Sequence, residues 1–268
     1  MGLGIAQLGV QHGLPTVLFD LSPTALEKAQ TAIATGLGKL VEKNKLTPEA
    51  REAALARLTV TTRLEDVRAD LIIEAVVERL DVKHQLFQQL AALNGPTTIL
   101  ASNTSSLPIT QLAAPVPQPE RVVGMHFFNP APLMPLVEVI SGVATDAAVA
   151  DAVEALARRL GKTPVRAADA PGFIVNRVAR HYYVESLKVV EEQVAPLEVV
   201  DELLEASGFK MGPFRLMDLI GVDTNFSVTS AMFASFHQDA KFRPSRIQQQ
   251  KVDAGHHGRK TGRGFYTY

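Results

Sequence analysis

The feature that most limits what this chain can fold into is a change of pattern near residue 168. Up to that point short strand-like apolar runs alternate with helical patterns, and beyond it the segments are helical. Strands that alternate with helices predict a parallel sheet covered by helices on both faces. The sequence therefore predicts an α/β domain with a Rossmann-like, doubly wound sheet over residues 1–168. A smaller all-α domain should follow over residues 169–268.

The expected elements are short and evenly spaced. The strand-like runs lie at 15–20, 58–62, 71–77, 98–102, 121–128 and 136–141. Helical patterns cover 1–12, 23–41, 48–57, 82–92, 146–160, 173–192, 196–206 and further stretches from 218 onward. Ser22 is a suitable N-cap for the helix that follows it, because its hydroxyl can accept a backbone N–H.

Composition narrows the class of protein. The 268 residues are 46% hydrophobic, which is enough for a packed core. A net charge of -1 provides no basic field for nucleic acid or for an anionic membrane. No apolar run reaches transmembrane length, and no basic region precedes an apolar one at the N-terminus. We therefore expect a cytoplasmic protein without nucleic-acid or membrane partners.

The types of residue that are absent narrow the chemistry as well. The chain has no cysteine, which excludes disulfides, thiolate zinc sites and a cysteine nucleophile. His256 and His257 are adjacent in a glycine-rich tail, where neighbouring side chains point in different directions. The sequence predicts no metal site.

The N-terminus matches part of a dinucleotide-binding unit. In such a unit a strand leads through G-x-G-x-x-G into a helix, and the next strand ends in an acid that binds the adenosine ribose. Gly2 fits the third glycine, and Asp20 fits the ribose acid, which favours NAD over NADP. The first strand and the first two glycines are absent from the sequence. An ordinary strand–helix unit is the alternative interpretation.

His126 and Glu138 are candidates for a catalytic pair. Each lies in a strongly apolar run, and neighbouring strands would bring the two side chains into hydrogen-bonding reach. A carboxylate beside an imidazole fixes its orientation and raises its proton affinity, which suits a general base. The alternative is a structural histidine paired with a buried acid.

Four further polar residues follow apolar runs or begin a helix. Ser105 can hold a substrate oxygen, although it or Ser106 can instead cap the helix that leads to Leu112. Asn176 begins the first long helix of the second domain. Glu78 and Lys83 follow the run that ends at Val77, and either border a cofactor or form a solvated helix start.

A basic cluster lies around the predicted turn between the second and third helices. It consists of Lys39, Lys43, Lys45 and Arg51. Such a cluster can meet the phosphates of a carrier such as CoA, and a solvated helical face is the alternative.

The order and spacing of these segments resemble the short-chain L-3-hydroxyacyl-CoA dehydrogenase family along the whole chain. The matching segments are GIAQ (4–7), FD (19–20), EAVVE (74–78), ASNTSSL (101–107), HFFNP (126–130), LVEVI (136–140), PGFIVNR (171–177), MGPF (211–214) and KTGRGFY (260–266). Together these segments are specific, although each one alone is weak.

The resemblance implies a role for each matching residue. His126 stands at the catalytic histidine and Glu138 at its partner, while Ser105 and Asn176 stand at residues that orient the substrate. Cofactor contacts are implied for Gly2, Asp20, Glu78, Lys83, Asn103 and Asn129, and a contact with the CoA phosphates is implied for Lys43. The implied reaction is NAD-dependent oxidation of 3-hydroxyacyl-CoA between the two domains, in a homodimer that forms through the helical domain.

The sequence departs from the family pattern at its start. Members carry a strand and G-x-G-x-M ahead of the position of Gly2. Either the chain starts at an internal methionine of a longer protein, which we favour, or it is a shortened, non-catalytic relative that binds NAD poorly. A hydroxy-acid dehydrogenase that acts without CoA on the same scaffold is the other alternative.

Overall fold

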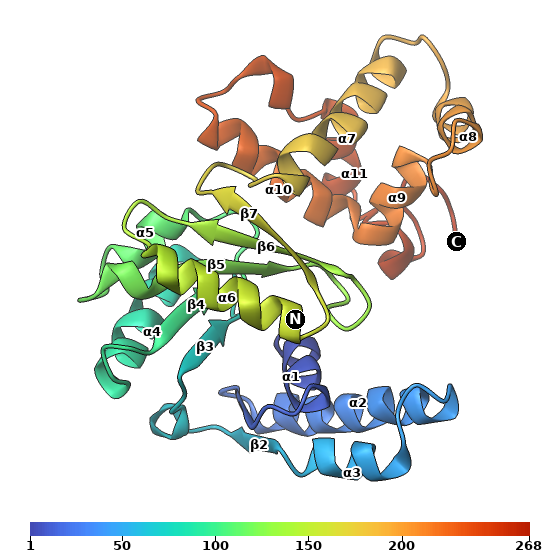
Figure 1. Cartoon of the computed structure of the whole chain (residues 1–268). Coiled ribbons are helices and arrows are strands. Elements are labelled where there is room, and N and C mark those ends of the chain that lie inside the picture. The colour runs from blue at the N-terminus through green and yellow to red at the C-terminus, as the bar shows by residue number, and fades with distance from the viewer. The chain divides into compact units, whose positions relative to one another are not determined.

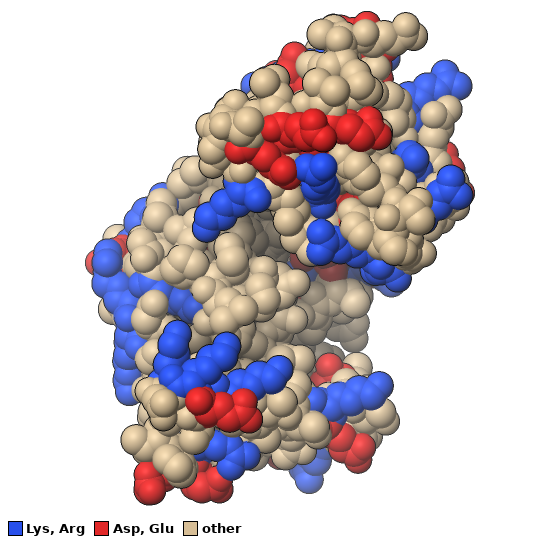
Figure 2. Space-filling model, turned by 90° about the vertical axis from the view of Figure 1, so that its right-hand side faces the viewer, with Lys and Arg blue, Asp and Glu red and all other residues tan.

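The computed structural model describes all 268 residues and divides them into two compact units (Figure 1). The first unit comprises Met1–Ala170 and the second comprises Pro171–Tyr268. Acidic and basic side chains both occur on each unit in the face shown in Figure 2. No helix combines the length and the apolar character that crossing a membrane requires.

The first unit is α/β. Its strands are β1 (Thr16–Phe19), β2 (Leu58–Thr61), β3 (Leu71–Glu74), β4 (Ile99–Ser102), β5 (Val122–Phe127), β6 (Leu136–Ser141) and β7 (Thr163–Ala168). Its α-helices are α1 (Gly2–Gln11), α2 (Pro23–Glu42), α3 (Pro48–Leu55), α4 (Leu80–Leu93), α5 (Ile109–Ala113) and α6 (Ala147–Arg159). Short 3-10 turns lie at Leu64–Asp66 and Pro119–Arg121.

The strands form two sheets. One has the order β3-β4-β5-β6-β7, in which β5 and β6 are antiparallel and the other neighbours are parallel. The other consists of β1 and β2 alone, paired in parallel. Helices cover both faces of the larger sheet: α6 packs on the face of Met125, whereas Ile109 of α5 lies against Gly124 on the other face (Figure 1). This is the Rossmann-like, doubly wound arrangement that the sequence predicts.

Strands β1 and β3 each keep an unpaired edge. Thr16 N donates to Arg57 O just before β2, and Asp20 N donates to Thr61 O at the end of β2. The backbone groups of Val17 and Phe19 therefore point away from β2. Similarly, Asp70 O and Glu74 O accept bonds at β4, so the backbone groups of Leu71 and Ile73 point outward. Each of these edges can therefore pair with a further strand.

Helix α1 joins the cores that belong to the two sheets. Every residue from Gly4 to Val10 is buried. Ile5 and Leu8 pack with the strands and α6 of the larger sheet, whereas Ala6 and Val10 pack with α2 and α3. A helix that is buried on all sides needs apolar or small residues all round, which explains its composition.

The second unit is all-α. Its helices are α7 (Val175–Glu191), α8 (Leu197–Ala206), α9 (Pro213–Ile220), α10 (Val222–Ser235) and α11 (Arg246–Asp253), with 3-10 turns at Ala240–Phe242 and Arg259–Thr261. Its core contains Tyr183, Leu187, Val200, Phe214, Met217, Val222 and Phe265. The C-terminal segment is fastened to this core because buried Asp218 accepts hydrogen bonds from Phe265 N and Tyr266 N at 2.8 and 2.9 Å.

Two elements differ from the sequence prediction. Strand β7 was not predicted, because its burial pattern gives no regular apolar face. Strand β3 ends at Glu74, three residues earlier than expected, where the Glu74 carboxylate accepts Val76 N at 2.7 Å and ends the extended backbone. The N-cap at Ser22 is confirmed, since its Oγ accepts Ala25 N at 3.2 Å.

Candidate active site

His126 and Glu138 lie directly opposite each other on the antiparallel strands β5 and β6. His126 Nδ1 and Glu138 Oε2 are 2.8 Å apart, and the two side chains are 7% and 1% exposed. An ionised carboxylate can only accept a hydrogen bond, so the ring donates through Nδ1. The basic lone pair of the neutral ring is therefore on Nε2. Phe128 packs against the imidazole, with ring centroids 4.6 Å apart.

The two side chains occupy the sheet face that α5 covers. His126 lies two residues from Gly124 on β5, so both point to the same side. A Cβ on Gly124 would lie 2.8 Å from Ile140 Cβ and 3.0 Å from Ile109 Cδ1, so this face is too tightly packed there for a larger residue. Close packing on this face holds the imidazole and the carboxylate in one geometry.

Asn103 fastens the chain after β4 to the end of β5. Its Oδ1 accepts Phe127 N at 2.8 Å, which is the amide directly after His126. Its own N–H donates to Glu74 O at 2.8 Å. Asn103 therefore extends the sheet pairing by one residue and fixes where the loop of Ser105 begins.

Glu78 organises the loop that carries Ser105. Its Oε1 accepts hydrogen bonds from Thr104 Oγ1, Ser105 N, Ser106 N and Ser106 Oγ over distances of 2.5 to 3.2 Å. Burial raises the pKa of Glu78, but the Lys83 ammonium and the Thr104 and Ser106 hydroxyls outweigh it and lower the pKa. Glu78 is therefore ionised at neutral pH, and its charge holds the loop.

The alternative in which Ser105 or Ser106 caps helix α5 is wrong. The cap residue is Pro108, which has no side-chain hydrogen bond to offer. Instead, the carboxylate of Asp169 accepts Ile109 N and Thr110 N at 2.9 and 2.7 Å. Asp169 lies about sixty residues further along the chain, so the sequence near α5 could not indicate it.

Lys83 is enclosed by two carboxylates. Its ammonium lies 3.1 Å from Glu74 Oε2 and 2.7 Å from Glu78 Oε2, and its side chain is 1% exposed. Ser102 Oγ also donates to Glu74 Oε2 at 2.6 Å. Lys83 was predicted as a cofactor contact, and this geometry lets it act on a ligand through Glu78. Glu74 and Ser102 were not singled out, although both lie in segments that match the family.

Lys162 holds the loop that connects β5 to β6. Its ammonium donates to Ala131 O and Met134 O at 2.6 and 2.9 Å, and burial lowers its pKa. A Cβ on Gly4 would lie 3.0 Å from Pro132 in the same loop, so the first turn of α1 packs against it. Asn129 is exposed at the start of this loop.

The two predicted residues of the dinucleotide unit flank the smaller sheet. Asp20 is exposed just after β1, where its Oδ1 accepts Ser22 N at 2.9 Å. A Cβ on Gly2 would make an ordinary contact with Leu18, 3.9 Å away, whereas Gly4 and Gly9 make the tight contacts of α1. The N-cap of α1 provides no side-chain hydrogen bond, and its first turn carries no acidic residue.

The two remaining predicted residues lie on helices. Lys43 is exposed at the C-terminal end of α2, as are Lys39 and Lys45. Asn176 is half-buried in the first turn of α7, in the second unit. The structure thus brings His126 together with Glu138, and Glu78 with Lys83 and the Ser105 loop.

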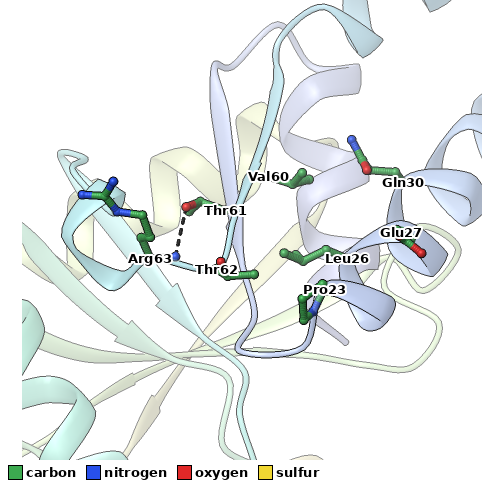
Figure 3. A pocket seen from close by; sticks show the side chains of 8 residues that line it. All are labelled: Pro23, Leu26, Glu27, Gln30, Val60, Thr61, Thr62 and Arg63. Carbon is green, nitrogen blue, oxygen red and sulfur yellow. Dashed lines mark hydrogen bonds between the residues drawn. The ribbon is translucent and has the colours of Figure 1, made fainter.

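An open hollow of about 350 Å³ lies between α2 and the end of β2 (Figure 3). Its lining comes from Pro23, Leu26, Glu27, Gln30 and residues Val60–Arg63, and it contains none of the predicted site residues. Arg63 points away from Leu26, while its N–H donates to Thr61 Oγ1 at 3.0 Å. No group of three or more His, Asp or Glu side chains is arranged so that it could hold a metal ion.

Comparison with known proteins matches both units. Residues 1–170 match "3-hydroxyacyl-CoA dehydrogenase, NAD binding domain", and residues 172–268 match "3-hydroxyacyl-CoA dehydrogenase, C-terminal domain". The chain is 49% identical to 3-hydroxyadipyl-CoA dehydrogenase of Escherichia coli over its whole length, which is 57% of that protein. It is 43% identical to a probable 3-hydroxybutyryl-CoA dehydrogenase of Deinococcus radiodurans, of which it covers 96%.

A solved structure shows the same fold. The (S)-3-hydroxybutyryl-CoA dehydrogenase from Ralstonia eutropha superposes with a TM-score of 0.96 at 41% identity, covering 100% of this chain and 95% of that one. The order of strands and helices agrees with these matches. The chain belongs to the 3-hydroxyacyl-CoA dehydrogenase family, with the NAD-binding domain of that family followed by its C-terminal domain.

Proposed function

We propose that this chain oxidises 3-hydroxyacyl-CoA thioesters to 3-oxoacyl-CoA with NAD, and that His126 is the general base. The observation that carries the proposal is the buried 2.8 Å contact between His126 Nδ1 and Glu138 Oε2. Two relatives support the substrate class, since they are named for 3-hydroxyadipyl-CoA and 3-hydroxybutyryl-CoA. Those names leave the far end of the acyl chain open.

Glu138 determines how the imidazole acts. Because Nδ1 donates to the carboxylate, Nε2 is the atom that takes the proton from the substrate 3-hydroxyl. The hydride on the same carbon passes to NAD, which supplies the redox chemistry when bound, and a ketone remains. The buried carboxylate then stabilises the imidazolium that has formed.

Ser105 and Asn176 hold the substrate oxygens in this proposal. The position of Ser105 is fixed because its backbone N–H donates to the ionised Glu78. Asn103 and Asn129 follow the parallel strands β4 and β5, and the carboxyl ends of such strands border the ligand site in open α/β sheets.

The first unit offers suitable groups for NAD. The first-turn N–H groups of α1 have no side-chain cap, which suits a phosphate near Gly2. The exposed carboxylate of Asp20 suits the adenosine ribose. Glu78 borders the cofactor, and Lys83 acts through it. On α2, Lys43 provides a charge for the CoA phosphates.

The homodimer is a proposal that rests on exposed apolar side chains of the helical unit. Large apolar residues of this unit are at least 45% exposed at Val199, Leu203, Phe209, Leu219 and Ile220. Such a set favours burial against a second copy. Sedimentation that gives the mass of one chain would contradict the dimer. We place the protein in the cytoplasm, where NAD and acyl-CoA are both available.

The first prediction separates the thioester reaction from a reaction on free acids. We expect kcat/KM for 3-hydroxybutyryl-CoA to exceed that for free 3-hydroxybutyrate by about 100-fold or more, because the CoA portion supplies binding energy. Reduction of NAD is followed at 340 nm, a wavelength at which NADH absorbs and NAD does not. Equal values for the two substrates would favour the CoA-independent dehydrogenase.

The second prediction concerns the base. His126→Gln should lower kcat by about 1,000-fold, since a general base contributes roughly 10²- to 10⁴-fold. Circular dichroism should show an unchanged fold. The matched control is His256→Gln, which removes an imidazole from the C-terminal tail and should leave kcat unaltered. A His126→Gln enzyme with the parent rate would remove His126 from this role.

The third prediction addresses the cofactor and the open strand edges. Calorimetric titration with NADH should reveal one site per chain, and a folded sample without detectable binding would favour the non-catalytic relative. A strand and a G-x-G turn fused ahead of Met1 should pair with β1 and β3 and tighten NADH binding through added phosphate contacts. Unchanged affinity in the fusion would contradict this use of the two edges.

A further inference from the structure

Arg180 is a buried cation of α7 with no carboxylate beside it. Its exposed fraction is 3%, and it takes part in none of the ion pairs of the chain. Burial lowers its pKa to about 10 despite the neighbouring Tyr183, so it keeps its charge at neutral pH. A buried charge without a counter-charge is costly, typically by several kcal/mol. An anion would remove much of that cost.

One edge of the guanidinium is unused. Both hydrogen bonds come from Nη1, which donates to Asn225 O at 3.0 Å and to Thr229 Oγ1 at 2.9 Å. Nε is sealed from solvent and has no partner. The Nε and Nη2 hydrogens point in parallel and match the two oxygens of a carboxylate. The edge of Arg180 that makes no hydrogen bond is therefore the one that binds carboxylates best.

Two other buried cations of the chain lie beside negative charge, although Arg121 Nε is also sealed without a partner. Lys83 lies between two carboxylates. Arg121 donates to Gly95 O and Ala91 O near the C-terminal end of α4, where the helix dipole is negative. Arg180 lies over the Tyr183 ring, 5.1 Å from its centroid, but no carboxylate or helix C-terminus lies beside it, because the carbonyl that it meets belongs to the interior of α10 and also accepts Thr229 Oγ1.

The surroundings of Arg180 are polar in an otherwise apolar core. Asn225, Thr229 and Gln248 are each at most 2% exposed. Gln248 Nε2 donates to Asn225 Oδ1 at 2.9 Å, whereas Gln248 Oε1 is sealed without a partner. Arg180 Nε and Gln248 Oε1 thus both lack a partner, and of these two atoms the Nε donor is the one that suits an anionic ligand group.

Arg180 also lies close to the substrate-binding turn of α7. It follows Asn176 by four residues, so both side chains lie on one face of the helix, about 6 Å apart along the axis. Long helical side chains tend to lean toward the N-terminus, which is the direction of Asn176, and the Arg180 guanidinium also contacts Asn225 and Thr229 of α10. Three bonds in an extended chain span about 3.8 Å, so a carboxyl carbon three bonds beyond the hydroxyl-bearing carbon comes within reach of the guanidinium.

We propose that Arg180 binds a carboxylate at the far end of the acyl chain, so that the substrates are 3-hydroxyacyl-CoA thioesters of dicarboxylic acids. This inference rests on the proposed function, in which Asn176 holds a substrate oxygen. Arg180 determines specificity, while His126 and Glu138 perform the same proton transfer on either kind of chain.

The test compares two thioesters of equal length. 3-Hydroxyadipyl-CoA ends in a carboxylate, and 3-hydroxyhexanoyl-CoA ends in a methyl group. We expect the parent enzyme to favour the former in kcat/KM by about 50-fold or more, as expected for a charge-assisted, two-pronged hydrogen bond. Arg180→Met should reduce this ratio to near one, and Arg180→Lys should give an intermediate ratio. Arg177→Met, which removes an exposed arginine of the same helix, is the control and should keep the ratio.

Each contrary outcome has a distinct meaning. A parent enzyme that turns over both thioesters equally well would overturn the inference and leave the proposed function intact, even if the Arg180 variants failed to fold. An Arg180→Met enzyme that loses rate on both substrates with an unchanged ratio would assign Arg180 to structure alone. Turnover of neither thioester by the parent enzyme would overturn the proposed function and the inference with it.

Discussion

The buried contact between His126 and Glu138 is the interaction on which the proposed chemistry depends. Its geometry follows from strand register, because the two residues are direct partners of an antiparallel pair inside a mainly parallel sheet. Shifting that register by one residue would place His126 and Glu138 on opposite faces of the sheet. Both faces of β5 and β6 are buried, so such a shift would place the side chains of one closely packed face against the packing of the other. The core therefore sets the position of the proposed base.

Paired charge organises the rest of the site in the first unit. Glu74, Lys83 and Glu78 form a chain of contacts from the end of β3 to the loop of Ser105. Each buried charge in this chain has a partner, which is the condition under which burial is tolerated. In the second unit, by contrast, the Arg180 guanidinium lies over the Tyr183 ring with no carboxylate beside it, and this contrast underlies the proposed carboxylate site.

Sequence patterns predicted most of the fold because they report local physics. The alternation of apolar runs located every strand except β7, whose burial pattern is irregular. The sequence patterns also predicted that Glu138 lies next to His126, but their spacing alone left open whether the pair is catalytic or structural. The cap of α5 could not be predicted, since Asp169 comes from a distant part of the chain. Glu74 and Ser102 were missed for the same reason, because their role depends on a hydrogen bond between residues of different strands.

The central claim is that His126 and Glu138 act as one unit, and a double-mutant cycle on kcat tests it most directly. If Glu138 acts only through the imidazole, the variant that combines His126→Gln with Glu138→Gln should be as slow as His126→Gln alone, within about twofold. The loss caused by Glu138→Gln should thus vanish once the imidazole is gone. Two losses that multiply in the double variant would contradict the pair, because they would show that the two residues act independently.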